Sequence, residues 1–312
     1  MRYPPIEVAM KLTKEDSRLF RKHSEPFRIE SGLGFKLRSV DPSDTLHLGS
    51  DDKPRAQKTL ARGVECLSAL QNRLYAQDRW SVLLVFQAMD AAGKDSAIDH
   101  VFSGVNPQGC QVTSFKAPSS EELDHDFLWR CVRALPERGR IGIFNRSYYE
   151  EVLIVRVHEQ ILAQQKLPPS LVTKKIWRQR YEDIRNFESF LARNGVLILK
   201  FFLHVSPEEQ KRRFLSRIDD HEKNWKFEMA DVREREHWDE YMDAYEQMVR
   251  HTSAPCAPWY VVPADNKWFT RLVVASAIVK SLDELDLHYP DIDKRKRAEL
   301  EQARKALRAE RR

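Results

Sequence analysis

An apolar run that ends abruptly in a loop of small residues constrains the fold of this chain more than any other feature. Residues 82–87 read Val-Leu-Leu-Val-Phe-Gln, and residues 88–95 read Ala-Met-Asp-Ala-Ala-Gly-Lys-Asp. A continuous apolar run of this length is typical of a parallel strand that is buried on both faces. The loop after it is typical of a turn whose backbone N–H groups contact phosphate, with Lys94 placed on the phosphate charge. An ordinary strand-to-helix turn would have a similar sequence. The rest of the chain is therefore needed to distinguish the two interpretations.

The loop matches the pattern G-x-x-x-x-G-K-[ST] only in part. Gly93 and Lys94 fit, and Ala88 lies near the place of the first glycine. Asp95 stands where a hydroxyl residue normally holds magnesium. Asp90, inside the loop, is then the best candidate for a magnesium ligand.

Composition limits the kind of protein without identifying it. The chain has 312 residues, 42% of them hydrophobic, and its 52 basic residues are nearly balanced by 47 acidic ones. A net charge of +5 does not indicate a nucleic-acid partner, so any anion-binding surface has to be local. The four cysteines form no C-x-x-C pair, which favours a reducing compartment over a zinc site or a disulfide framework. No apolar run approaches the roughly 18 residues that span a bilayer. We therefore expect a cytoplasmic protein with no membrane partner.

Helical and strand patterns alternate along most of the chain. We expect strands at 82–87, 110–115, 140–145, 196–204 and 259–262. We expect helices at 54–77, 95–103 and 119–135, across 147–191, from 206, near 235–250 and from 267 to about 285. This alternation predicts an α/β fold of three layers, in which helices flank a parallel sheet.

The chain divides into three parts in this interpretation. Residues 1–53 show weak periodicity and are expected to form an irregular arm. Residues 54–290 form one domain, which includes a lid segment at about 206–235. Residues 291–312 are rich in charge and are expected to form a solvated helix.

A second informative stretch, residues 140–151, is an apolar strand that ends in polar groups. It contains Asn145, Arg146 and Glu150. The carboxyl ends of parallel strands meet at one edge of a sheet, where ligands bind. Asp90 and Lys94 should therefore lie beside these three residues. Simpler interpretations remain open: Arg146 and Glu150 could form an ion pair four residues apart, and Asn145 could be an N-cap.

Basic residues add a possible anion-binding channel. They gather between residues 211 and 235, where Arg213 and Arg217 fall on one helical face. Lys116, Arg130 and Arg133 would extend the channel beside the loop. Interspersed acidic residues weaken the case, and a solvated surface would have the same composition.

Several segments together resemble the family 2 polyphosphate kinases over residues 54–290. The matching segments are 87–95 (QAMDAAGKD), 103–109 (SGVNPQG), 114–118 (SFKAP), 145–150 (NRSYYE), 217–220 (RIDD), 224–227 (NWKF) and 259–265 (WYVVPAD). The resemblance implies a P-loop kinase-like fold with a helical lid, and phosphoryl transfer between inorganic polyphosphate and a nucleotide. It also accounts for both departures in the loop, because the family's own pattern carries an aspartate inside the loop and tolerates an acidic residue after the lysine.

The resemblance implies roles for the residues singled out above. Polyphosphate would lie along Ala91, Ala92, Gly93, Lys94, Asp95, Lys116, Arg130, Arg133, Arg213 and Arg217. Catalysis would use Asp90, Lys94, Arg146 and Glu150, and Mg²⁺ would be held by Asp90, Asn145 and Glu150. Glu150 resembles the class that accepts both nucleoside monophosphates and diphosphates, and the family likeness also implies a homo-oligomer.

Two rival interpretations remain at this stage. An ATP-dependent kinase of nucleotides or of another small molecule would share the loop and the lid. A non-catalytic polyanion binder would use the same basic residues, but the acidic residues near the loop argue against it.

Overall fold

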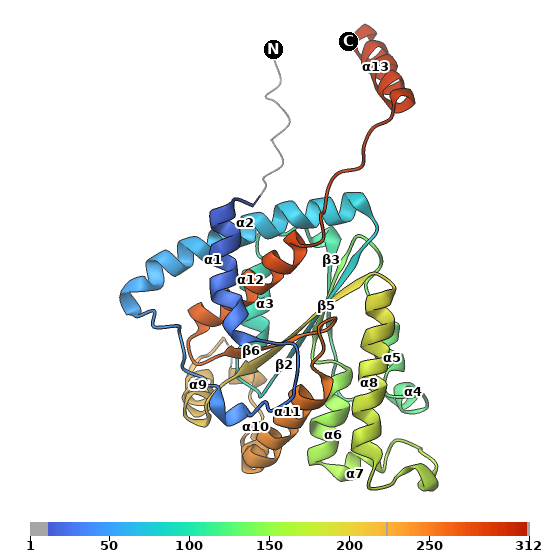
Figure 1. The fold of residues 1–312 in the computed structure, drawn as a ribbon. Helices are drawn as coiled ribbons and strands as arrows, with labels where there is room; N and C mark the ends of the chain where they lie inside the picture. Colours follow the sequence, from blue (N-terminus) through green and yellow to red (C-terminus); the bar gives the residue numbers. More distant parts are fainter. Residues whose placement is uncertain (1–11, 223, 311–312) are drawn as a thin grey trace.

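The computed structural model describes residues 12–222 and 224–310. Within these ranges the centre of the fold is a six-stranded sheet with the order β1-β6-β5-β2-β4-β3 (Figure 1). The strands are β1 (Arg28–Ile29), β2 (Ser81–Ala88), β3 (Cys110–Ser114), β4 (Ile141–Asn145), β5 (Val196–His204) and β6 (Trp259–Pro263). The last five of these run parallel, as the sequence predicts, whereas β1 pairs antiparallel with β6 at one edge. The sheet is therefore mixed.

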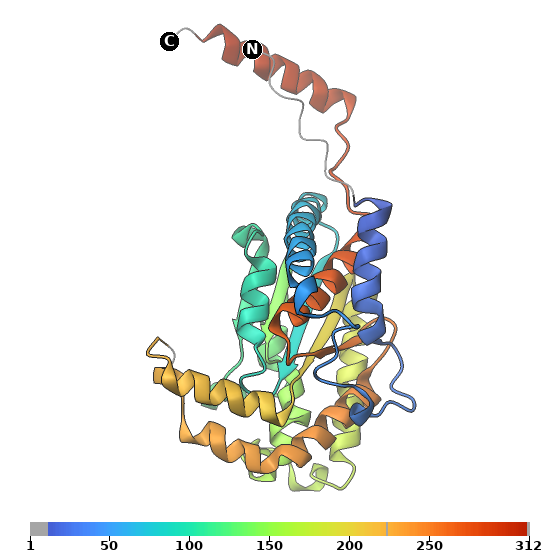
Figure 2. The ribbon, with the colours of Figure 1, turned by 90° about the vertical axis from the view of Figure 1, so that its left-hand side faces the viewer.

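Helices cover both faces of the sheet (Figures 1 and 2). The longer ones are α1 (Lys14–Ser24), α2 (Lys53–Gln77), α3 (Lys94–Phe102), α8 (Ile176–Arg193), α9 (Pro207–Asp219), α11 (Trp238–Thr252), α12 (Lys267–Asp283) and α13 (Lys294–Ala309). One layer contains α12 packed on α1, α2 and α3, and the other contains α8 packed on α11. In the described part of the chain, a helix with the length and apolar character needed to cross a membrane is absent.

The register of the central strands positions the site. Every residue from Val82 to Phe86 is fully buried, because β2 lies between β4 and β5 with helices on both faces. Phe86 pairs with Asn145 of β4 on one side and with Phe201 of β5 on the other. The loops that follow β2 and β4 therefore leave the same edge of the sheet, as expected for parallel neighbours.

The expectation of an irregular N-terminal arm is wrong for residues 14–29, which form α1, the turn η1 (Glu25–Phe27) and β1. The Thr13 hydroxyl accepts the Asp16 N–H, and the Asp16 carboxylate accepts the Thr13 N–H, so a capping box starts α1. Phe20 is 1% exposed where α1 packs on α12. The capping pair was visible in the sequence, but the few apolar residues after it gave no clear helical period.

The helix expected at 119–135 is interrupted. It forms as two short pieces, α4 (Ser120–Leu123) and α5 (Trp129–Val132). Between them the Asp126 carboxylate accepts the Leu128 N–H at 2.9 Å, so a local side-chain turn replaces the helical hydrogen bonds. Residues 147–175 are likewise a series of short turns, which include η5 (Tyr148–Val152), α6 (Ile154–Val157) and α7 (Glu159–Leu162).

The lid segment and the C-terminal helix take the expected form. The lid contains α9, η7 (Asn224–Lys226) and α10 (Met229–Glu234), and the turn η8 (Arg235–His237) leads from it into α11. Lys223, one of its basic residues, lies outside the described residues. Helix α13 is exposed along its length and stands away from the domain (Figure 2).

Candidate active site

The loop between β2 and α3 has the conformation of a phosphate-binding turn. Gly93 adopts φ +105°, a left-handed conformation that residues with a Cβ rarely take, and Lys94 then begins α3. Ala91 also has a positive φ, of 59°. The loop therefore enters the N-terminus of a helix, where backbone N–H groups and the helix dipole favour anions.

Lys94 is buried beneath this loop. Its ammonium donates to the Ala88 carbonyl oxygen at 3.0 Å. Burial lowers the pKa of Lys94, although the nearby carboxylates of Asp90 and Glu150 act in the opposite direction. A partly desolvated cation is stabilised strongly when a negatively charged phosphate oxygen binds next to it.

This lowered pKa predicts a pH dependence. In the free protein Lys94 should lose its proton below the 10.5 of an ordinary lysine, so kcat/KM should fall on the alkaline side below that pH. Bound polyphosphate stabilises the proton, so the alkaline fall of kcat should lie at higher pH than that of kcat/KM. Initial rates measured across pH test this expectation.

The control for the pH experiment is Lys94→Arg. A guanidinium keeps its proton throughout this range, so the variant should lose the alkaline fall whatever its residual rate. Identical profiles for the variant and the wild type would assign the fall to another group.

Arg146 and Asp90 form an ion pair across the mouth of the loop. The Arg146 Nη2 donates to Asp90 Oδ1 at 2.9 Å, and both side chains are a little over one-third exposed. Arg146 has φ +65°, and its N–H donates to the Phe86 carbonyl oxygen, so its backbone is tied to β2. The interpretation that Arg146 pairs with Glu150 is thus not what the structure shows.

Glu150 is held from the central strand instead. The buried side chain of Gln87, in β2, donates from Nε2 to Glu150 Oε1 at 2.9 Å. Glu150 and Arg146 line two neighbouring cavities at once, one of about 300 Å³ and one of about 110 Å³. The smaller cavity also contains Asp90 and, from the end of the lid, Glu234. Arg146 and Glu150 therefore stand at the passage between the two cavities.

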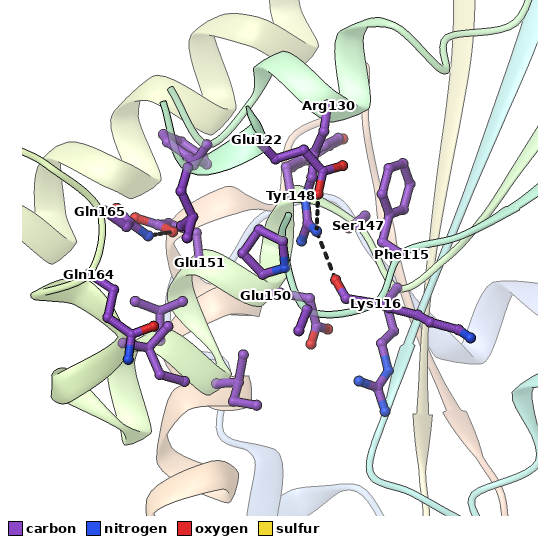
Figure 3. Close-up of a pocket in the computed structure, with 18 of the residues that line it drawn as sticks. Phe115, Lys116, Glu122, Arg130, Ser147, Tyr148, Glu150, Glu151, Gln164 and Gln165 are labelled. Carbon is purple, nitrogen blue, oxygen red and sulfur yellow. Dashed lines mark hydrogen bonds and ion pairs between the residues drawn. The ribbon is translucent and has the colours of Figure 1, made fainter. Parts of the chain in front are cut away.

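The larger cavity has both apolar and polar walls (Figure 3). Arg130 packs over the Phe115 ring and donates to the Lys116 carbonyl oxygen at 2.7 Å. The Lys116 side chain extends along the rim, away from Glu151 (Figure 3). Glu151 is buried, its pKa is raised by that burial, and it accepts hydrogen bonds from Arg180 and Gln165. Internal hydrogen bonds thus fix Glu151 in this wall. Glu150 is the carboxylate that lines both cavities.

The three predicted metal ligands do not meet at one point. Asn145 donates from its amide to the Asp95 carboxylate, and these two residues line a separate groove beside α3. The alternative that Asn145 is a simple N-cap also fails, because Ser147 is the residue that caps η5. Asp90 and Glu150 do share the smaller cavity. Among the residues described, no three acidic, histidine or cysteine side chains are grouped to hold a metal ion.

This arrangement still fits magnesium. Mg²⁺ is commonly held by one or two carboxylates, with phosphate oxygens and water completing its octahedron. Asp90 and Glu150 supply two carboxylates beside the phosphate-binding loop. These two side chains are therefore the ones that could hold Mg²⁺ together with a bound phosphate chain.

The remaining predicted phosphate ligands lie in different places. Arg213 is turned inward, and its guanidinium donates to backbone carbonyls of the loop. Arg217 stacks over Phe214 and faces Asp231 at 4.0 Å. Arg133 is exposed and lies over the Trp129 ring at 4.8 Å. Lys116 and Arg130 were also predicted to bind phosphate. Both line the larger cavity, together with Arg146.

Sequence reasoning missed two glutamines of the site. Gln87 orients Glu150, and Gln210 of α9 donates from Nε2 to the Asp90 carbonyl oxygen at 3.0 Å. Gln87 could have been recognised in the sequence, because it is a polar residue at the end of an otherwise apolar strand. Gln210 lies among charged residues on a surface helix, and nothing in the sequence sets it apart from them.

Comparisons with known proteins show the family of this chain. The family model described as "Polyphosphate kinase 2 (PPK2)" matches residues 50–290. The ADP-polyphosphate phosphotransferase of Rhodopseudomonas palustris is 56% identical over 289 residues, which cover 91% of this chain and 98% of that protein. The AMP/ADP-polyphosphate phosphotransferase of Meiothermus ruber is 44% identical over 264 residues, covering 85% and 94%.

A solved structure gives the same answer for the fold. The crystal structure of polyphosphate kinase 2 from Arthrobacter aurescens matches with a TM-score of 0.81 at 40% identity, and covers 90% of this chain and 96% of that one. The fold is the three-layer P-loop kinase-like fold with a helical lid that the sequence resemblance implies. The chain belongs to the polyphosphate kinase 2 family.

Proposed function

We propose that this protein transfers the terminal phosphoryl group of inorganic polyphosphate to AMP, ADP or both, reversibly and with Mg²⁺. One observation carries the proposal: Arg146 and Glu150 line both the cavity beside the phosphate-binding loop and the larger cavity next to it. A phosphate chain on the loop and a nucleotide in the larger cavity would therefore meet at these two side chains. The relatives' names agree with this pair of substrates.

The side chains fit a transfer that needs little covalent chemistry from the protein. The bond between the terminal phosphorus and its bridging oxygen breaks, and a bond forms to an oxygen of the acceptor phosphate, so the chain loses one unit. Lys94 and Arg146 would hold and neutralise the transferred group. The acceptor phosphate is already anionic, so no general base is required. Asp90 and Glu150 would hold Mg²⁺, which would supply positive charge to offset that of the phosphates.

The test is an incubation of the purified protein with long-chain polyphosphate, Mg²⁺ and either AMP or ADP, without ATP. ADP or ATP should appear, as measured by chromatography. Transfer to a nucleotide or another small molecule from ATP without polyphosphate would favour the ATP-dependent kinase. Binding of polyphosphate without turnover would favour the polyanion binder.

We further propose that the protein works in the cytoplasm as a homo-oligomer. Its four cysteines are unpaired, which suits a reducing compartment. The oligomer is inferred from the family likeness and would be measured by light scattering.

Glu150 is proposed to help AMP serve as an acceptor. In Glu150→Asn, one negative charge is removed from the passage, which favours the more highly charged ADP. We expect the ratio of AMP to ADP turnover to fall by about tenfold, equivalent to ~1.4 kcal/mol between the two transition states. Parallel assays with each acceptor measure this ratio.

The matched control is Glu137→Gln, which removes a carboxylate whose side chain is 78% exposed and paired with Arg140. It should leave the ratio unchanged. If Glu150→Asn also leaves it unchanged, Glu150 does not govern acceptor choice.

A further inference from the structure

Three successive carbonyls of the phosphate-binding loop are held by one helix of the lid segment. The Gln210 amide donates to the Asp90 carbonyl oxygen at 3.0 Å. Three residues further along α9, Arg213 Nη1 donates to the carbonyl oxygens of Ala91 at 3.0 Å and Ala92 at 2.6 Å. These three carbonyls of the loop are thus fixed by side chains of α9.

The guanidinium of Arg213 has no donor left for a phosphate. Its Nε donates to Glu209 Oε1 at 2.7 Å. Its Nη2 donates to the carbonyl oxygens of Ala264 at 2.5 Å and Asp265 at 3.1 Å. Together with the two bonds to the loop, these engage all five N–H groups that an arginine carries. The side chain is 6% exposed, so solvent does not compete for these bonds.

Holding the carbonyls determines where the amides point. In a trans peptide the C=O and the following N–H point in opposite directions. The bonds to Asp90, Ala91 and Ala92 therefore turn the N–H groups of the next residues toward the opposite side of the loop. The Ala92 N–H donates to the Met89 carbonyl oxygen within the loop. The Gly93 N–H lies next to Lys94, at the start of α3.

We propose that Arg213 and Gln210 are positioning residues, which set the direction of the loop amides through the carbonyls on the other side. The proposal rests on the proposed function, in which the loop binds polyphosphate. Arg213 then acts through the fixed fork of its guanidinium and not through its charge. A lysine keeps the charge but cannot bridge two loop carbonyls and the turn after β6 at the same time.

The same contacts join the loop to the far end of the lid. Arg235, in η8, donates to the Gln210 side-chain oxygen and, at 3.1 Å, to the Pro207 carbonyl oxygen. Both ends of the lid segment therefore meet at Gln210. A displacement of α9 would release the loop carbonyls and change the direction of the loop amides.

The experiment compares Arg213→Lys and Arg213→Gln with the wild type, with Arg212→Gln as the matched control. Arg212 is the next residue on α9, its side chain is 69% exposed, and its ion pair is also with Glu209. Both Arg213 variants should raise KM for polyphosphate by at least tenfold and by similar factors. Arg212→Gln should stay within twofold. A KM near the wild-type value in Arg213→Lys, with a loss only in Arg213→Gln, would overturn the proposal, because charge would then suffice.

A second readout does not depend on turnover. Tripolyphosphate should shift the Gly93 amide signal in ¹⁵N-labelled wild-type protein, and the shift should be lost in Arg213→Lys. If the wild type shows no turnover but shows this difference, the proposed function fails and the positioning role stands. An equal shift in both proteins would overturn the positioning role. If the Arg213 variants do not fold, Gln210→Met removes one loop bond without changing charge and should still raise KM; an unchanged KM would count against the proposal.

Discussion

Replacing Lys94 with alanine is expected to lower kcat/KM for polyphosphate by about a hundredfold to a thousandfold, the usual effect of removing a buried group that stabilises transferred charge. Lys94 is buried, and its ammonium is held in place by the Ala88 carbonyl oxygen beneath the loop. Steady-state rates and a thermal unfolding curve measure the two consequences separately. Folding should be retained, because the hydrogen bond that is lost is to a backbone carbonyl and Asp90 keeps its ion pair with Arg146.

Lys116→Ala is the matched control for this variant. It removes the same charge from the exposed rim of the larger cavity, where Lys116 has no buried contact to lose. Its effect should be only a few-fold, as expected for a screened surface charge. A Lys94→Ala protein that works within threefold of the wild type would refute the assignment of this loop as the phosphate site.

The second large effect concerns stability. Lys200 lies in the central strand β5 and is fully buried, and its ammonium donates to Glu188 Oε2 at 2.7 Å and to the Tyr149 hydroxyl at 2.9 Å. Lys200→Ala leaves Glu188 buried without a cation, so we expect the free energy of unfolding to fall by about 3–5 kcal/mol. Urea unfolding followed by circular dichroism measures the change.

The double variant Lys200→Met with Glu188→Gln tests the cause. It removes both charges, so most of the lost stability should return. The Glu188 carboxylate also accepts the hydroxyls of Tyr148 and Tyr149, which a glutamine oxygen can still accept. A single variant that loses less than about 1 kcal/mol would show that water or another cation compensates Glu188.

The fold could largely be predicted because its parallel strands are buried on both faces. The run at 82–87 and the run at 196–204 are apolar almost throughout, and they became β2 and β5. The arm at 14–29 could not be predicted in the same way. Its helix buries few side chains, and β1 has only two residues, which pair with a strand more than 200 residues away. Nothing local marks such a pairing.

The sequence predicted which residues come together at the site, because that depends on where they follow the strands along the chain. Parallel neighbours β2 and β4 had to bring Asp90, Lys94, Arg146 and Glu150 to one edge, and the structure brings them together. The direction of a side chain was not predictable. Asn145 turns to Asp95, and Arg213 turns inward to the loop, because of contacts with segments that are distant in sequence.

The N-terminal arm has a practical consequence for anyone who shortens this protein. The family match begins at residue 50, yet β1 covers the edge of β6, the Leu37 N–H bonds Glu246, and the Pro42 carbonyl oxygen accepts the Asp265 N–H. A version begun at residue 50 would keep every matched residue and still uncover a strand edge made of Trp259 and Tyr260. Exposed apolar edges pair with other chains, so such a version should aggregate during expression. The region that the family model matches is therefore smaller than the unit that folds.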